Sequence, residues 1–542
     1  MAFRVYNPYV TAAIATIGGM IFGFDISSVS SFIGEDGYRE FFDYPDSITQ
    51  GGITASMPGG SFIGSLCSGP ISDKLGRKPV IQLASVIWMV GSAIQCAANG
   101  QPALICGRFI SGWAIGFCSS QVPVYIAELS PKNIRGRLVG IFQWAITWGI
   151  MIMFYISYGC THMSYPAAFR TAWGIQMVPG FLLLLGTLVL PESPRWLAKE
   201  DRWEEAIEII SKVQGGGDVN HPQVLVEVEE IKEVIRIERE AKSITILSLF
   251  KKDSINRTMV GVWGQIWQQL CGNDLGMNVM MYYIVFIFYM AGFEGNAALV
   301  SSSIQYVINM VMTIPALLFI DKWGRRPLFI FGGCLMTLWL VLMAILLGVF
   351  SDPVDSVQGN DQIRILIPPE HSSASKAVIA CSYLFVATFA PTWGPGMWIY
   401  CSEIFPLNQR AIANGLCAGS NWIFNFALAL FVPPAFTNIT WKTYVMFAVF
   451  CFAMTVHVFL LFPETKGKTL EEIGQIWEEK IPAWKTASFE PRRPSASEIK
   501  EAGGIHAISE KMHQAVHEDE QVHPSQSPLG TKEANPNAAN AV

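Results

Sequence analysis

The sequence has few charged residues. Asp, Glu, Lys and Arg make up 15% of its 542 residues, whereas soluble proteins usually carry about 25%. Hydrophobic residues make up 51%, and the mean hydropathy is +0.35. Because this excess is spread over many long runs, it excludes a set of soluble domains and indicates an integral membrane protein. The weak net charge of −6 suggests no nucleic-acid partner.

The sequence also lacks the residue patterns of metal sites and active sites. Its 11 cysteines are scattered, mostly inside apolar runs, and form no CxxC pair. We interpret them as packing residues and expect no metal or other cofactor. There is no HExxH motif, and of the eight histidines only His457 clearly lies within an apolar run, near its end. An intramembrane enzyme is therefore disfavoured.

Apolar runs long enough to cross a bilayer occur in two groups of six. They lie near 9–30, 52–71, 80–98, 102–126, 138–160 and 171–190, and near 259–291, 297–320, 327–350, 376–401, 411–432 and 442–462. The pattern predicts an all-α membrane protein with twelve transmembrane helices in two six-helix bundles. The predicted domains are a first bundle 1–190, a linker 191–256 of amphipathic cytoplasmic helices, a second bundle 257–470 and a mostly disordered cytoplasmic tail 471–542.

Basic residues gather in alternate short loops. They are Lys74, Arg77 and Lys78 after the second run, Lys132, Arg135 and Arg137 after the fourth, and Lys322, Arg325 and Arg326 after the eighth. Since Lys and Arg are enriched in cytoplasmic loops, both termini and the linker are expected in the cytoplasm. The sequon at Asn438 then lies outside and is a glycosylation candidate.

Three short motifs recur in the same order in the two halves. SDKLGRKP at 72–79 matches IDKWGRRP at 320–327, ELSPKNIR at 128–135 matches EIFPLNQR at 403–410, and PES at 191–193 matches PET at 463–465. An ordered triple match indicates two homologous halves.

The charged residues of these motifs are placed at cytoplasmic helix ends, where opposite charges can pair. They are Asp73, Arg77, Glu128 and Arg135 in the first half, and Asp321, Arg325, Glu403 and Arg410 in the second. An exposed ion pair contributes only about 0–1 kcal/mol, so a gate needs a partly buried network. We interpret the set as a cytoplasmic gate that also fixes topology.

The seventh apolar run carries many amides. The segment GQIWQQLCGNDLGMNVMMYY, residues 264–283, contains three glutamines, two asparagines and an aspartate. Polar groups at membrane depth must face protein or a wet cavity. Because an amide both donates and accepts, this set suits a ligand with many hydroxyls. The alternative is hydrogen bonding between helices.

Several segments resemble signatures of the sugar porter family of the major facilitator superfamily. They are GRFISGWAIGF, PVYIAELSPKNIRGRL, PESPRWL, QQLCG, DKWGRRP, SEIFP and PETKGKTLEEI. The likeness is greatest to fungal high-affinity hexose transporters. It implies a plasma-membrane carrier of a monosaccharide such as glucose, functional as a monomer in the lipid bilayer, that works by alternating access. A sugar sensor, or a carrier of quinate, inositol or maltose, remains an alternative.

The resemblance also implies which residues contact the sugar. They are Gln268, Gln269 and Asn278 in the seventh run, Asn309 in the eighth, Trp398 in the tenth, and Asn421 and Trp422 in the eleventh. The chain departs from the family twice: Ile150 stands where relatives have a glutamine, and 273–276 reads as an insertion of just over one helical turn.

Two ionisable residues lie inside apolar runs of the first half. Asp25 is in the first run and Arg108 is in the fourth. Such residues are functional by default and generally paired. The family resemblance implies that Asp25 carries a coupling proton and that Arg108 modulates it. Proton symport is the favoured interpretation, and facilitative uniport is the alternative.

Overall fold

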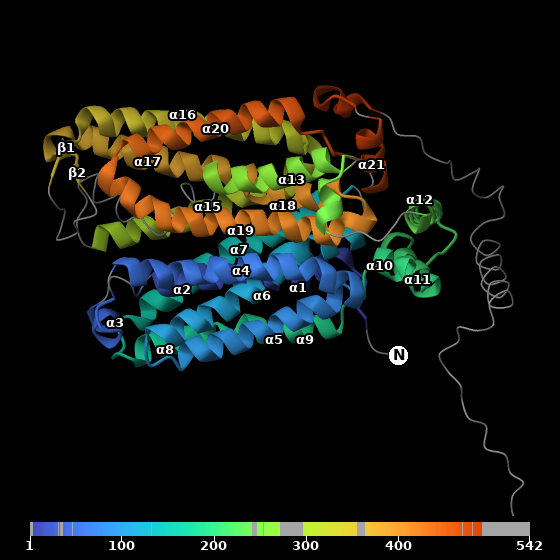
Figure 1. Ribbon diagram of the computed structural model, residues 1–542, viewed down its shortest axis with the longest axis horizontal. Helices are drawn as coiled ribbons and strands as arrows, with labels where there is room; N and C mark the ends of the chain where they lie inside the picture. The colour runs from blue at the N-terminus through green and yellow to red at the C-terminus, as the bar shows by residue number, and fades with distance from the viewer. Residues whose placement is uncertain are drawn as a thin grey trace, which may run out of the picture.

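The computed structural model describes residues 4–489 except 31, 33–35, 46, 132, 241–245, 253, 272–295, 355–363, 469 and 480. Helices dominate this part of the chain and form two bundles that lie side by side (Figure 1). One bundle contains α1 to α9 and the other contains α13 to α20. The predicted all-α class is confirmed, apart from a two-stranded hairpin of β1 (Asp352–Pro353) and β2 (Ile365–Leu366).

The first bundle follows the predicted runs closely. Its helices are α1 (Pro8–Ala15), α2 (Ile17–Ser30), α4 (Ser47–Leu75), α5 (Arg77–Cys96), α6 (Gln101–Leu129), α7 (Arg135–Cys160), α8 (Ala167–Ile175) and α9 (Met177–Leu188). The first and sixth spans each consist of two consecutive helices, α1–α2 and α8–α9. A short helix, α3 (Asp36–Phe41), connects the first span to the second.

The second bundle repeats the plan. Its helices are α13 (Ile255–Trp267), α15 (Asn296–Trp323), α16 (Arg325–Phe350), α17 (Ser372–Phe389), α18 (Trp393–Ile404), α19 (Leu407–Asn438) and α20 (Lys442–Leu461), with the turn η3 (Pro369–His371) before α17. The tenth span is broken between α17 and α18. The seventh span begins with α13 and continues to 271, and its part from 272 onward, including 273–276 and Asn278, lies outside the described residues.

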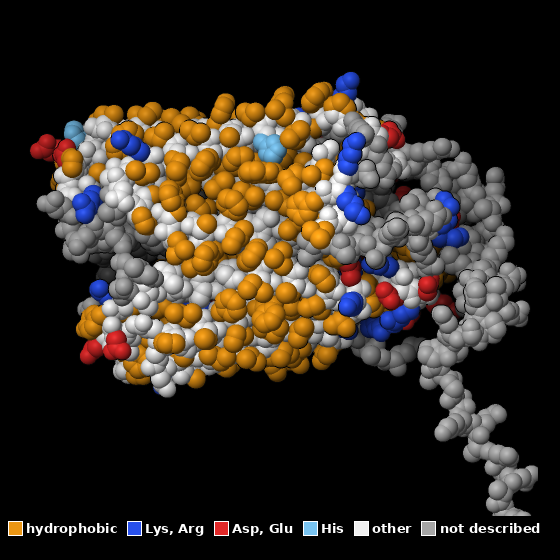
Figure 2. All heavy atoms as spheres, viewed as in Figure 1, with side chains coloured by type: hydrophobic (Ala, Val, Ile, Leu, Met, Phe, Trp, Pro, Cys, Tyr) orange, Lys and Arg blue, Asp and Glu red, His pale blue; other side chains and the backbone are white. Residues whose placement is uncertain are grey.

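Ten helical segments of the described chain are long and apolar enough to cross a membrane. The helix α4 has 29 residues but is rich in Gly and Ser, so its hydropathy is lower. Hydrophobic side chains cover much of the visible face of both bundles, while charged side chains gather toward the two ends (Figure 2). This distribution fits a hydrocarbon environment around the middle of the helices.

The two ends of the molecule differ. One, here named the linker end, carries α10 (Pro194–Lys199), α11 (Trp203–Gln214) and α12 (Pro222–Glu240) together with α21 (Leu470–Glu478); the other, here named the α3 end, carries α3 and the β-hairpin (Figure 1). Within the predicted linker 191–256, the described residues form α10, α11, α12 and the 3₁₀ turn η1 (Ile246–Phe250).

The predicted tail 471–542 begins with folded structure. The helix α21 buries Ile473 and Ile476, which are three residues apart and therefore share one face. After it, the turn η4 (Ala483–Ser488) buries Thr486, whose Oγ1 accepts a hydrogen bond of 2.8 Å from the backbone N–H of Glu464. The first residues of the predicted tail, through η4, therefore pack against the second bundle.

Candidate functional site

A cluster of buried amides joins the seventh and eleventh spans. Three glutamines, Gln265, Gln268 and Gln269, are at most 1% exposed, and the helix adopts π geometry over 268–271. π-bulges are frequent at functional sites because they re-aim side chains. Asn421 of α19 donates to Gln265 Oε1 at 2.8 Å and to Gln268 Oε1 at 3.1 Å, and its own Oδ1 accepts from Gln269 Nε2. Asn421 is therefore the centre of the cluster.

The break in the tenth span supplies backbone acceptors to this cluster. Gln268 Nε2 donates to the carbonyl oxygens of Trp393 and Gly394, each at 3.0 Å. These carbonyls belong to the first turn of α18, directly after the break. The cluster thus connects three spans of the second half, through α13, α18 and α19.

Two predicted site atoms have no hydrogen-bond partner within the described chain. They are Gln269 Oε1 and Asn309 Oδ1, both on residues at most 1% exposed. A buried acceptor left unpaired costs about 1–3 kcal/mol. Such atoms are suited to accept hydrogen bonds from the hydroxyls of a ligand. Asn309 lies on α15, which packs against α7 of the other half.

The two predicted tryptophans face the first half. Trp398 is 2% exposed and packs edge-on against Phe142 of α7, with ring centroids 5.8 Å apart. Trp422 donates from Nε1 to Ser119 Oγ at 3.0 Å and packs against Phe22 of α2 at 4.8 Å. Both indoles therefore lie where the halves meet, and Trp422 is bonded to α6 rather than to the amides.

Two residues missing from the predicted set lie beside the cluster. Gln265 is three and four residues before Gln268 and Gln269, so helical periodicity alone places it on the same face. Gln143 of α7 has its Cγ 3.6 Å from where a Cβ on Gly394 would be. It therefore brings an amide of the first half to the broken tenth span. By contrast Ile150, at the position of the family's glutamine, is 2% exposed, and its carbonyl accepts from Ser27 Oγ.

The gate residues of the first half form a buried network at the linker end. Arg77 donates to both carboxylate oxygens of Glu128, at 3.0 and 3.2 Å, and lies 3.5 Å from Asp73. Arg77 and Glu128 are each at most 1% exposed. Arg135 donates across the halves to the carbonyl of Lys468 at 3.4 Å.

The second half carries the matching network. Arg325 lies 2.8 Å from Glu403 and 3.0 Å from Asp321. Two further contacts cross between the halves: Arg410 Nη1 lies 3.4 Å from Glu128 Oε1, and Asp321 accepts from the backbone N–H groups at the start of α7, at 3.0 and 2.8 Å. All eight predicted gate residues thus lie at one end, where Glu128, Arg135, Asp321 and Arg410 make contacts between the halves.

The predicted coupling pair is present inside the first half. Arg108 Nη1 lies 3.4 Å from Asp25 Oδ1, and the side chains are 1% and 0% exposed. Arg108 Nε also donates to the carbonyl of Ile53 at 3.0 Å. A buried ion pair of this kind is costly unless its remaining polar atoms are satisfied.

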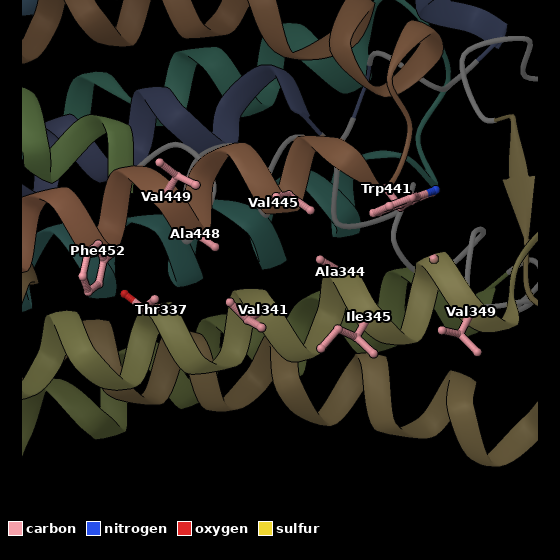
Figure 3. A pocket seen from close by; sticks show the side chains of 11 residues that line it. Thr337, Val341, Ala344, Ile345, Val349, Trp441, Val445, Ala448, Val449 and Phe452 are labelled. Carbon is pink, nitrogen blue, oxygen red and sulfur yellow. The ribbon is translucent and has the colours of Figure 1, made fainter.

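A groove of about 550 Å³ lies between α16 and α20, on the outer face of the second bundle. Aliphatic side chains such as Val341, Ile345 and Val449 project into it, with Trp441 at one end and Thr337 at the other (Figure 3). Its lining is almost entirely apolar, so it does not suit a polyhydroxy solute. The candidate site is the amide cluster.

Two similar helical bundles meet through an ion pair and backbone hydrogen bonds at one end and through the Trp422–Ser119 bond in the middle, and a buried amide cluster lies beside this junction. This arrangement is that of a membrane transporter. Comparison with known proteins also indicates a transporter. A family model described as "Sugar (and other) transporter" matches residues 11–477. The chain therefore belongs to this sugar transporter family, and it is a transporter rather than an enzyme.

Curated relatives are similar over nearly the whole chain. A "High-affinity glucose transporter" of Kluyveromyces lactis is 56% identical over 492 residues, covering 91% of this chain and 89% of the relative. A "High-affinity glucose transporter 1" of Candida albicans is 52% identical, covering 92% of this chain and 90% of the relative.

A solved structure of the major facilitator superfamily has the same fold. It is the proton:xylose symporter XylE bound to 6-bromo-6-deoxy-D-glucose. It superposes with a TM-score of 0.75 at 25% identity, over 87% of this chain and 99% of that one. The predicted twelve-helix class of this superfamily is thereby confirmed.

Proposed function

We propose that this protein transports a glucose-type hexose by alternating access and couples import to a proton. The observation that carries the proposal is the hub at Asn421, which bonds to Gln265, Gln268 and Gln269 while fully buried. Amides that only joined helices would use all their capacity on each other, yet Gln269 Oε1 and Asn309 Oδ1 lack partners among the described residues. The high identity to named glucose transporters supports the same substrate class.

In this proposal hydrogen bonds from the cluster to the sugar replace hydrogen bonds within the cluster. Hydroxyls donate to Gln269 Oε1 and Asn309 Oδ1 and replace the Asn421 contacts of Gln268 and Gln269. Because amide and hydroxyl bonds are of similar strength, the exchange costs little. The indole of Trp398 offers an apolar face to the C–H groups of the ring. Asn278 stays a predicted contact outside the described residues.

Alternating access follows from which contacts join the halves. The cross-half contacts of Arg410, Asp321 and Arg135 all lie at the linker end. Separation of the halves there breaks these bonds while the pairs inside each half, such as Arg77 with Glu128, persist. The two halves then move as rigid bodies about the central cluster.

The orientation and setting are part of the proposal. The linker end, with its basic loops, faces the cytoplasm together with both termini. The α3 end then faces the outside of the plasma membrane, as does Asn438 at the end of α19, whose exposed amide donates to the carbonyl of Pro434 at 2.9 Å. Glycosylation of Asn438 stays a prediction. We propose a functional monomer, because each required residue lies within one chain, with the proton as the only coupling ion.

The test is uptake of radiolabelled glucose in cells that lack hexose carriers. Saturable glucose entry that is blocked by hexoses, not by quinate or inositol, and abolished by a protonophore is the expected result. Entry that persists with the protonophore but does not exceed equilibrium identifies a uniporter. Tight binding without entry identifies a sensor.

A further inference from the structure

Only one of the two carboxylate oxygens of the buried Asp25 has a bonding partner in the described chain. Its Oδ1 pairs with Arg108, but its Oδ2 has no hydrogen-bond partner in the described chain. The hydroxyls of Ser28 and Ser111 are its neighbours, yet each donates to a backbone carbonyl instead, at 2.9 Å. One oxygen of the predicted proton carrier is therefore free to accept.

A second unsatisfied group lies toward the α3 end. Tyr38 of α3 is fully buried among the rings of Phe42 and Phe169, at centroid distances of 4.9 and 6.4 Å. Neither Tyr38 Oη nor Gln50 Nε2, from the first turn of α4, has a partner in the part of the chain that the structure describes. A hydroxyl inside an aromatic cluster is costly to bury without a bond.

The helix α4 connects Gln50 to the Asp25 pair, because Arg108 Nε donates at 3.0 Å to the carbonyl of Ile53, three residues after Gln50. Burial raises the pKa of Tyr38 to about 12, against the smaller opposing effects of Arg108 and of the Gln50 side chain. The phenol therefore stays protonated at physiological pH and can both donate and accept. Besides Asp25, Arg108 and Tyr38, the titratable groups near this path are Arg39 and Glu40 of α3, Asp43 just after it, Tyr165 beside Gly37, and Arg170, which lies 5.8 Å from the centre of the Phe41 ring. The neighbouring polar groups from α4, α5 and α6 are the neutral Gln50, Gln95 and Ser111.

Orphaned buried polar atoms are the usual partners of ordered water, which typically makes about three hydrogen bonds. We propose that Tyr38 and Gln50 hold ordered water that conducts protons between the α3 end and Asp25. This path runs through the first half, separate from the amide cluster that takes the sugar. The inference rests on the proposed proton coupling and names the residues that give the proton access.

The proton balance is simple. A proton arriving at the α3 end enters the water chain, and a water gives a proton to Asp25 Oδ2. Tyr38 Oη and the Gln50 side chain hold these waters by hydrogen bonds and neither gain nor lose a proton. Asp25 gains one proton and becomes neutral, which weakens its pairing with Arg108. Tyr38 acts as a positioning residue, because the proton resides on Asp25.

The experiment compares Tyr38→Phe with the parent protein in proteoliposomes that contain a pH-sensitive dye. Removing one oxygen is expected to slow sugar-dependent proton entry about tenfold. The outside pH for half-maximal uptake should then fall by about one unit, because tenfold more protons restore the rate. Sugar counterflow at pH 5 on both sides, which needs no net proton movement, should be unchanged and reports folding. The matched control is Tyr44→Phe, at a tyrosine 64% exposed near the same end.

The outcomes separate the inference from the coupling itself. If Tyr38→Phe keeps the parental proton flux and pH profile while Asp25→Asn abolishes both, the path is wrong and the coupling stands. If the parent moves no protons with sugar, the coupling fails and the path fails with it. If Tyr38→Phe loses counterflow as well, Gln50→Leu replaces it, with the same expected shift and the same contrary result.

Discussion

The two halves of the molecule carry the same junction at the linker end, built from the same contacts. Glu192 accepts from the backbone N–H of Arg77 at 3.0 Å, and Glu464 accepts from that of Arg325 at 3.0 Å. Ser193 donates to Glu128 as Thr465 does to Glu403. The repeated motifs therefore share their hydrogen bonds as well as their residue types.

The junctions differ in which carboxylate reaches across the interface. In the first half the crossing acid is Glu128, which takes Arg410 in addition to Arg77. In the second it is Asp321, which accepts from the start of α7, whereas its counterpart Asp73 faces Lys199 of the linker at 3.6 Å. The same motif thus contacts the other half through a different acidic residue in each half: Glu128 in the first and Asp321 in the second.

The interiors of the halves differ more. The first contains a buried ion pair of Asp25 and Arg108, and the second contains neutral amides around Asn421. A buried carboxylate can bind a proton. Amides can donate hydrogen bonds to hydroxyls and accept hydrogen bonds from them. The two halves therefore share the network at the linker end and differ in the chemistry of their buried polar groups.

The sharpest way to break this comparison is to remove the amides of the second half. Gln268→Leu with Gln269→Leu deletes two partners of Asn421, so saturable glucose uptake should fall at least 100-fold. The measurement is initial uptake at equal surface expression. The matched control is Gln176→Leu, a fully buried glutamine of the first half. An unchanged half-saturation constant in the double variant would place the sugar elsewhere.

The second largest effect tests the asymmetry of the gate. Glu128→Gln should destabilise the protein by about 3–5 kcal/mol, because it leaves two buried arginines undercompensated. Glu403→Gln should cost less, since Arg325 keeps Asp321 at 3.0 Å. Thermal unfolding of the purified variants checks the order. Equal losses would contradict the assignment of Glu128 as the crossing acid.

A smaller effect isolates the contact between the halves. Arg410→Leu removes the pair with Glu128 but leaves Arg77 in place, so the population should shift toward opening at the linker end. The half-saturation constant for glucose should rise about tenfold from the α3 side and fall from the linker side in inverted vesicles. Arg326→Leu, at the neighbouring surface, serves as control. A rise from both sides would indicate damage to the site instead.

The sequence predicted the helical membrane architecture well, because the length of each apolar run indicates a membrane span and the basic loops indicate its orientation. It also predicted that opposite charges of the recurring motifs can pair within each half, and Arg77 with Glu128 and Arg325 with Glu403 are such pairs. It could not predict that Asp321 binds backbone N–H groups of α7, since such acceptors leave no trace in residue identity.

The site was predictable in its residue types and less so in its geometry. Helical spacing could have added Gln265 to the predicted set. No local pattern could show that Trp422 bonds to Ser119 of the other half, or that Gln143 approaches Gly394, because both depend on how the bundles pack. The helix α21 at the start of the tail follows from the spacing of Ile473 and Ile476, whereas the average polarity of the tail does not indicate it.

The smallest predicted effect tests whether the two junctions are equivalent in energy as well as in form. Gly76 and Gly324 have φ angles of 96° and 92°, and a Cβ on either would lie 2.6 Å from a carboxylate oxygen of Glu192 or Glu464. Residues with a side chain rarely adopt this backbone conformation. Gly76→Ala and Gly324→Ala should therefore each cost about 1–3 kcal/mol. Thermal unfolding should show the two losses matching closely, with Gly216→Ala as the control for positive φ in open space. A marked difference between the two losses of stability would mean that the junctions share their hydrogen bonds but differ in how tightly the backbone is packed at the glycine.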